Sequence, residues 1–351
     1  MPLPIAITMG DPAGIGAEIV ARAFLQAPDL TRGCFVVGDL ATLRRACHIV
    51  AGDAVTLPIA LLDAPAQALL CPPRCLPLWS IDGSTHEQTP EPFGQLSARA
   101  GRLAGDCVVW ATQAALRGEV AALVTAPLNK AALALAGPPY NVFPGHTEML
   151  QALAATHLAQ SVEQVPVRMM LANDELRVVL VSIHVALRQA IDALTVDSVL
   201  QTLMITHHSI SPVLGHAPRI GVAALNPHAG EGGLFGDEEQ RIIAPAVAAA
   251  RLQGVQASDP QPPDTVFMRA RATALRPGAF DVVVAMYHDQ GLIPVKYLGV
   301  ERGVNVTLGL PLVRTSPDHG TAFDLAGTGK ADAASLIEAI RMARDLAGID
   351  T

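Results

Sequence analysis

The sequence has no run of basic residues, and its acidic residues outnumber its basic ones. It contains 24 Lys and Arg against 32 Asp and Glu in 351 residues, which gives a formal net charge of −8. A surface of this kind does not attract nucleic acid or an anionic membrane, so we expect neither as a partner. An anionic ligand must then be held by a few cationic side chains at defined positions.

The sequence also has little that indicates secretion, a membrane or disulfide bonds. No uninterrupted apolar stretch reaches the roughly 18 residues that a membrane span needs. The first residues, Met-Pro-Leu-Pro-Ile-Ala-Ile-Thr, lack the basic region and cleavage pattern of a signal peptide. The cysteines are odd in number and scattered, which disfavours a disulfide framework, at Cys34, Cys47, Cys71, Cys75 and Cys107. Cys71 and Cys75 could form a metal pair, but we favour two reduced thiols in a loop and predict a soluble, cytoplasmic protein.

What the sequence does have is alternation of apolar runs with Ala- and Leu-rich stretches. Apolar residues make up 50% of the chain, which is enough for large cores. The alternation indicates an α/β fold with a largely parallel sheet and helices on both faces. We predict strands at 5–8, 35–37 and 121–125, helices at 18–26, 40–47 and 96–117, and proline-rich loops at 71–95 and 256–264.

Three of the apolar runs end in a histidine. Val178–Ile183 leads into His184, Ile220–Pro227 into His228, and Val282–Tyr287 into His288. Because the carboxyl ends of parallel strands share one edge of a sheet, these side chains can meet in space. Three neutral imidazoles could hold a divalent metal and leave positions open for water or substrate. Each histidine could equally be a hydrogen-bonded structural residue, since the spacing matches neither a zinc finger nor an H-E-x-x-H helix.

The glycine-containing loop Met9–Gly16 lies between the first strand and the first helix, where a dinucleotide-binding turn would lie. The match is poor, because Ile19 occupies the third glycine position and Asp11 would face a pyrophosphate with a negative charge. Asp39 resembles a ribose-binding acid but is as readily a helix cap. We favour a tight strand-to-helix turn that lines a cleft.

Several longer motifs are spread nearly end to end along the chain, from Met9-Gly-Asp-Pro through Thr125-Ala-Pro-Leu-Asn-Lys130 to Leu325-Ala-Gly-Thr-Gly. Between these lie Gly145-His-Thr-Glu148, Asn226-Pro-His-Ala-Gly-Glu231, Tyr287-His-Asp-Gln-Gly291, Gly303-Val-Asn-Val-Thr-Leu-Gly309 and Arg314-Thr-Ser-Pro-Asp-His-Gly-Thr321. Taken together, these motifs resemble the 4-hydroxythreonine-4-phosphate dehydrogenase family of pyridoxal phosphate biosynthesis. Two departures are Ser258-Asp259-Pro260, where a Gly-Pro pair is expected, and Pro317 in place of a valine.

The resemblance implies two α/β/α domains with a cleft between them, similar to isocitrate and isopropylmalate dehydrogenases. One domain would comprise residues 1–128 plus 305–351. The other would be a central domain of residues 129–304, with the metal ligands and dimer contacts. It further implies a homodimer with the active site in the interdomain cleft at the subunit interface.

The resemblance also assigns roles to individual residues. It implies metal ligands at His184, His228 and His288, and substrate binding by His146, Thr147, Lys296, Asn305 and Arg314. These substrate-binding residue types suit a phosphate dianion, which needs point charge, planar donors and neutral donors. We place the nicotinamide at Asp318, His319, Gly320 and Thr321, a glycine turn ahead of a helical stretch, with a plain helix-start turn as the alternative. The proton acceptor is left open among Asp264, Asp289 and Lys296, and Asp289 could instead orient His288.

The implied reaction is metal-assisted oxidation of 4-phosphohydroxy-L-threonine by NAD or NADP, followed by decarboxylation to 3-amino-2-oxopropyl phosphate. The metal would be Zn²⁺, Mg²⁺ or Co²⁺. Alternative substrates are a phosphothreonate, a phosphoerythronate or an aromatic cis-dihydrodiol carboxylate. From other classes, a metal-dependent hydrolase or phosphatase and a non-catalytic sugar-phosphate-binding module also remain.

Overall fold

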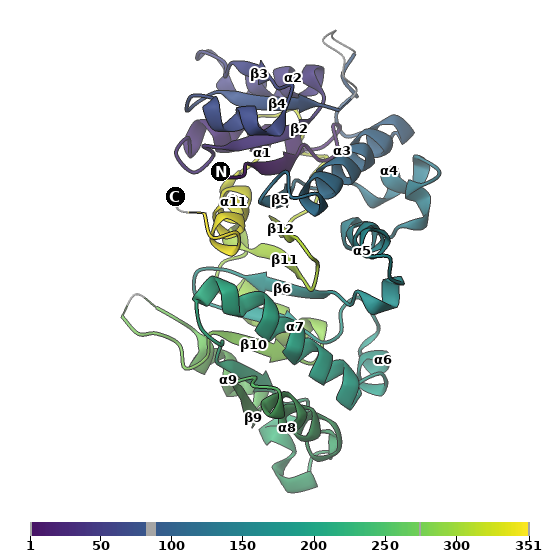
Figure 1. Cartoon of the computed structure of the whole chain (residues 1–351), viewed down its shortest axis with the longest axis vertical. Coiled ribbons are helices and arrows are strands. Elements are labelled where there is room, and N and C mark those ends of the chain that lie inside the picture. The colour runs from purple at the N-terminus through teal and green to yellow at the C-terminus, as the bar shows by residue number, and fades with distance from the viewer. Residues whose placement is uncertain (1, 82–88, 274, 350–351) are drawn as a thin grey trace. The chain divides into compact units, whose positions relative to one another are not determined.

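The computed structural model describes residues 2–81, 89–273 and 275–349, and the chain divides into two compact units (Figure 1). The first comprises Met1–Pro166 and Leu310–Thr351, and the second comprises Val167–Gly309. The sequence placed residues 129–166 in the central domain, whereas the compact units place them in the first. The reason is packing, because the helices α4 (Lys130–Leu135) and α5 (His146–His157) both lie against α3 (Ala98–Leu116).

The first unit is built on a parallel sheet with the strand order β3-β4-β2-β1-β5-β12. Its strands are β1 (Ile5–Thr8), β2 (Cys34–Gly38), β3 (Ile59–Leu61), β4 (Leu76–Ser80), β5 (Ala122–Thr125) and β12 (Val313–Pro317). Besides α3, α4 and α5, its helices are α1 (Gly16–Gln26), α2 (Leu40–Ala51) and α11 (Ala334–Leu346). Short 3₁₀ turns lie at Pro65–Leu70, Tyr140–Val142 and Val162–Gln164.

Local sequence explains where two of these helices begin. Asp39 caps α2 by accepting a hydrogen bond from Thr42 N, and Ser97 caps α3 by accepting one from Ala100 N. The strands and helices predicted at this end of the chain are confirmed, and Asp39 has the cap role. The loop predicted at 71–95 is wrong where β4 lies. Burial of the Leu76 and Leu78 side chains in the core stabilises the strand by more free energy than the missing N–H of Pro77 costs it. Residues 82–88 of that loop lie outside the described residues.

The second unit has the strand order β11-β6-β7-β10-β8-β9. Strand β6 (Arg168–Ala172) is antiparallel to β11 (Val304–Leu308) and to β7 (Arg177–Leu180). The other strands, β10 (Val282–Ala285), β8 (Ile220–Ala223) and β9 (Ala257–Gln261), continue parallel to β7. The helices are α6 (Leu187–Asp192), α7 (Val196–Leu214), α8 (Ala244–Leu252), α9 (Pro263–Ala270) and α10 (His288–Tyr297). A 3₁₀ segment lies at Pro227–Gly233, a π-helical turn at Glu239–Ile243 and a 3₁₀ turn at Val300–Arg302.

Strand β9 corrects the proline-rich loop predicted at 256–264. It is the last strand in the order and, among the strands of the described residues, pairs with β8 alone, a position where Pro260 is tolerated because no second neighbouring strand there needs its missing N–H. The register shifts between Ile220 and Val222, and Ser258 Oγ accepts a hydrogen bond from Val222 N at 3.0 Å. The departure Ser258-Asp259-Pro260 therefore forms part of the sheet.

None of the helices in the described part of the chain has the length and hydrophobicity needed to cross a lipid bilayer.

Candidate active site

The three strand-end histidines follow three strands that are direct neighbours in the second unit. β10 pairs in parallel with β7 on one side and with β8 on the other. His184 lies beyond the end of β7, His288 is the first residue of α10 after β10, and His228 lies in the 3₁₀ segment after β8. The prediction that these histidines share one sheet edge is confirmed.

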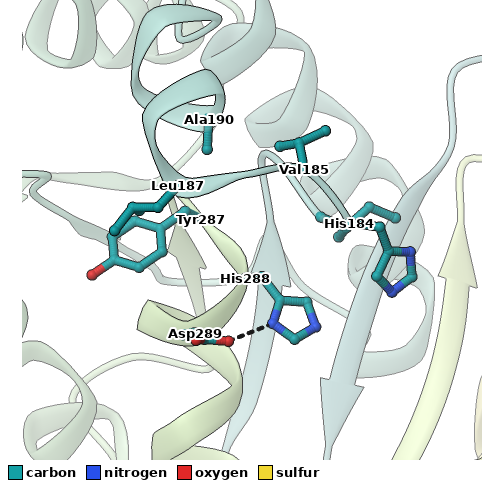
Figure 2. A pocket seen from close by; sticks show the side chains of 8 residues that line it. His184, Val185, Leu187, Ala190, Tyr287, His288 and Asp289 are labelled. Atoms are coloured by element: carbon teal, nitrogen blue, oxygen red, sulfur yellow. Dashed lines mark hydrogen bonds and ion pairs between the residues drawn. The ribbon is translucent and has the colours of Figure 1, made fainter.

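Two of these histidines are neighbours in the lining of a pocket of about 240 Å³ (Figure 2). The ring centroids of His184 and His288 are 5.7 Å apart, at an angle of 45°. Nδ1 of His288 lies 2.7 Å from Asp289 Oδ1. An ionised carboxylate only accepts hydrogen bonds, so a neutral His288 carries its proton on Nδ1 and keeps the Nε2 lone pair for a ligand. In Figure 2 this second nitrogen is on the side of His184.

The geometry of this pair fits a shared metal ion. With Zn–N bonds of about 2.1 Å in a tetrahedral site, two imidazole centroids are about 5 Å apart. The observed spacing is close to that value, and a carboxylate on the far nitrogen of a histidine ligand is the usual arrangement around zinc. Asp289 therefore has the geometry of an orienting group for His288.

His228 is not among the residues that line this pocket, and it lies on an unusual backbone. Residues 228–233 all have positive φ, including the non-glycine residues His228 (53°), Ala229 (56°) and Glu231 (44°). Left-handed geometry costs a non-glycine residue about 1–2 kcal/mol, and such strain often occurs at functional sites. The His228 ring lies 6.1 Å from the Phe235 ring, centroid to centroid. Within the described ranges, no group of three or more His, Cys, Asp or Glu side chains is placed to hold a metal.

The first unit contains a second cluster, around Arg314 on β12. This arginine is only 3% exposed, and its Nε and Nη2 donate to Thr125 Oγ1 at 3.2 and 2.7 Å. Burial lowers the Arg314 pKa to about 10, so it remains a cation at neutral pH.

His146 belongs to the same cluster. Burial, together with the positive charges of Arg314 and Lys130, holds the His146 pKa well below its ordinary value of 6.5, so the imidazole is neutral at pH 7. Its Nε2 is buried and has no hydrogen-bond partner among the described residues. Thr147 follows it in the first turn of α5 and is half-buried.

Lys130 has no role in the sequence-based assignment, although it belongs with this cluster. It is the first residue of α4, which Asn129 caps just beyond the end of β5. The histidines were singled out because each follows the end of a strand, and the same pattern could have identified Lys130.

The remaining predicted substrate and catalytic residues lie in the second unit and are not gathered at the histidine pocket. Lys296 is exposed near the carboxyl end of α10, and a rise of 1.5 Å per residue places its Cα about 12 Å along the axis from that of His288. Asn305 is half-buried on β11, opposite Leu171 of β6. Asp264 is exposed in the first turn of α9. Of the three candidate proton acceptors, Asp289 alone is among the residues that line this pocket.

The predicted cofactor residues 318–321 form a turn after β12 that contacts the glycine loop at the start of α1. Ile15 N donates to Thr321 O at 3.0 Å, and a Cβ on Gly14 would meet Thr321 O at 2.9 Å. Gly14 is therefore needed for close packing against this turn. Glu18 of α1 accepts hydrogen bonds from Gly327 N and Gly329 N. The helical stretch expected directly after the turn is wrong, because the chain continues in turns until α11 begins at Ala334.

Comparison with known proteins identifies the family. The family model described as pyridoxal phosphate biosynthetic protein PdxA matches residues 31–343. The 4-hydroxythreonine-4-phosphate dehydrogenase of Beijerinckia indica subsp. indica is 49% identical over 334 residues, which cover 95% of this chain and 92% of that protein. The D-threonate 4-phosphate dehydrogenase of Salmonella typhimurium is 46% identical over 343 residues, 98% of each chain.

A solved structure shows the same fold. The crystal structure of 4-hydroxythreonine-4-phosphate dehydrogenase from Klebsiella pneumoniae matches with a TM-score of 0.83 and 42% identity, covering 99% of this chain and 98% of that one. The resemblance found in the sequence motifs is confirmed. This chain belongs to the pyridoxal phosphate biosynthetic protein PdxA family and is an oxidoreductase of the dehydrogenase class.

Proposed function

We propose that this chain oxidises the C3 hydroxyl of 4-phosphohydroxy-L-threonine with NAD, or with NADP, and releases carbon dioxide to give 3-amino-2-oxopropyl phosphate. Oxidation removes a hydride from C3, which the nicotinamide accepts, and a proton from the hydroxyl. The resulting ketone is β to the carboxylate, so carbon dioxide can leave with the electrons taken up as an enolate, which is then protonated. The observation that carries the proposal is the His184–His288 pair, with Asp289 on Nδ1, in a chain whose relatives are dehydrogenases.

A divalent metal ion is part of this proposal. His184 and His288 would hold it, and His228 would complete the set from the turn after the neighbouring strand. The ion would supply Lewis-acid polarisation of the substrate hydroxyl. Imidazole ligands favour Zn²⁺ or Co²⁺ over Mg²⁺, which prefers oxygen.

The phosphate and carboxylate of the substrate require cations in this acidic protein. We propose that Arg314 and Lys296 bind anionic groups, with Thr147 and Asn305 as neutral donors. His146, neutral and with a buried Nε2, would hydrogen-bond the substrate without adding charge. Lys130 adds positive charge to the same cluster.

The remaining roles follow from position. The turn of Asp318, His319, Gly320 and Thr321 is the proposed nicotinamide site, supported by its packing on Gly14. Asp289 would orient His288 and Lys296 would keep its proton to bind an anionic group, which leaves Asp264 as the proton acceptor. We also propose a homodimer, because Val185 and Leu187 line the histidine pocket yet are 53% and 55% exposed.

The second candidate substrate is D-threonate 4-phosphate, favoured by the 46% identity with the Salmonella typhimurium enzyme. It shares the phosphate, the carboxylate and the oxidised hydroxyl, so the residues above suit either compound. An aromatic cis-dihydrodiol carboxylate suits them less, because it has no phosphate for Arg314 and Lys296.

The test is NADH formation by the purified protein with each substrate, with and without a chelator. We expect turnover of 4-phosphohydroxy-L-threonine that the chelator abolishes and Zn²⁺ or Co²⁺ restores. Turnover of D-threonate 4-phosphate without turnover of 4-phosphohydroxy-L-threonine would show that D-threonate 4-phosphate is the substrate. Phosphate release that needs no nucleotide would indicate a phosphatase and contradict the proposal.

A further inference from the structure

Met286 lies just beyond β10, and side chains form hydrogen bonds with both its backbone N–H and its backbone carbonyl. The ladder between β10 and β8 ends at Val284 and Val222, two residues before Met286 and Ala224. Beyond that point, the amide of Gln290 continues the connection. Its Oε1 accepts a hydrogen bond from Met286 N, and its Nε2 donates one to Ala224 O, each at 2.7 Å.

Gln290 is well suited to hold two strand ends at a fixed separation. Its side chain is 9% exposed, so water does not compete for these bonds. One orientation of the amide alone satisfies both partners, because an N–H needs the oxygen and a carbonyl needs the NH₂ group. The bridge joins the strand that leads to His288 with the strand that leads to His228.

Ser182 makes the corresponding link on the other side of β10. Its Oγ donates to Met286 O at 3.0 Å, two residues before His184. The backbone of Met286 is thus held by Gln290 through its N–H and by Ser182 through its carbonyl. Together with the backbone hydrogen bond from Val181 N to Ala285 O, these two side chains link the three strand ends that lead to the histidines.

The turn that carries His228 is anchored in its own way. Glu239 is 5% exposed, and its Oε1 accepts hydrogen bonds from Leu225 N and Asn226 N, both at 2.8 Å. This anchors the backbone directly before the left-handed segment. With Ala224 held by Gln290, the chain that leads to His228 is fixed at consecutive residues.

We propose that Gln290 and Ser182 are positioning residues, which set the spacing of the histidine-bearing loops through the backbone of Met286 and thereby the affinity of this edge for a divalent metal. The inference rests on the metal site of the proposed function and adds residues that act only through the backbone.

The experiment is calorimetric titration of the full-length protein with Zn²⁺. Zn²⁺ binding that is lost in His184→Ala defines the site. We expect Gln290→Met, similar in size but unable to form either bond, to raise the Kd for this Zn²⁺ by about 10- to 100-fold, as loss of supporting groups around a metal does.

The matched control is Asn173→Leu. Asn173 is another buried amide of the same unit, 8% exposed, which donates to Val295 O near the carboxyl end of α10 and accepts from Leu176 N, and neither bond joins two histidine-bearing loops. Both variants should lower Tm, but Asn173→Leu should leave the Kd within about twofold of wild type. An equal rise in Kd in both variants would show general loosening and overturn the proposal.

Ser182 gives a second and milder test, which decides the question if Gln290→Met does not fold. Ser182→Ala should raise the Kd, and Ser182→Thr, which keeps a hydroxyl, should restore it. Wild-type affinity in Ser182→Ala, or in a folded Gln290→Met, would overturn the proposal and leave the metal site intact. Undiminished Zn²⁺ binding in His184→Ala would instead remove the metal site and this inference with it.

Discussion

Replacing Arg314 with methionine should weaken substrate binding strongly while changing stability little. A hydrogen bond to a charged group contributes about 1.5–3 kcal/mol, and each 1.4 kcal/mol is a factor of about ten. The loss of one contact to the substrate's anionic group should therefore lower kcat/KM about 10- to 100-fold. Because a phosphate at C4 does not react, most of the change should lie in KM.

The stability expectation follows from the burial of the cation. A pKa lowered from 12.5 to about 10 means that the fold disfavours the charged form by about 3 kcal/mol, a cost fully present at neutral pH and released only as the pH rises past 10. Methionine removes this cost but also removes the bonds to Thr125 Oγ1, which contribute about 1.5–3 kcal/mol. The two effects oppose each other, so urea unfolding should give a free energy within about 2 kcal/mol of wild type.

The matched control is Arg344→Met, in the same unit. Arg344 is 8% exposed and donates to Leu30 O and Arg32 O from α11, away from the proposed site. The Arg344→Met variant should have a lower free energy of unfolding than wild type. Its KM, measured by NADH formation at varied substrate concentration, should equal that of wild type. An unchanged KM in Arg314→Met, or an equal rise in both variants, would refute the assignment of Arg314 to substrate binding.

Three further predictions concern other parts of the account. Asp289→Ala should raise the Kd for Zn²⁺ at least about tenfold by calorimetry, because His288 loses the carboxylate that fixes its tautomer; wild-type affinity would exclude that role. Gly14→Ala should raise the KM for NAD, because the new Cβ would meet Thr321 O at 2.9 Å and displace the 318–321 turn; an unchanged KM would place the cofactor elsewhere. The depressed pKa of His146 means that stability is lost as the pH falls below 6.5, because the unfolded chain takes up the proton first. In urea unfolding above and below pH 6.5, His146→Asn should lose less stability on acidification than wild type, and equal losses would contradict the assignment.

The sequence predicted the elements in which apolar residues and boundary signals agree. β1 and β2 are short apolar runs, and α2 and α3 begin at Asp39 and Ser97 caps. It failed at β4 and β9, where prolines favoured loops but burial of Leu76 and Leu78, and pairing of β9 with β8 alone, favoured strands.

The site was predictable to the extent that it depends on strand ends. Parallel pairing of β7, β10 and β8 brings the histidine-bearing loops to one edge, and this follows from the pattern of apolar runs. The left-handed backbone of residues 228–233 could not be predicted from this pattern, because a non-glycine residue such as His228 rarely has positive φ. The contacts of Gln290 with Met286 and Ala224 join residues of different strands, so no local pattern reveals them.

X-ray absorption at the zinc edge, on protein loaded with one equivalent of Zn²⁺, tests the metal site most directly. The proposed site, in which His228 would join the neighbouring rings of His184 and His288 when the metal binds, predicts scattering from three imidazole ligands in the wild type and from two in His228→Ala. A spectrum with oxygen ligands alone, or one identical in the His184→Ala variant, would contradict it.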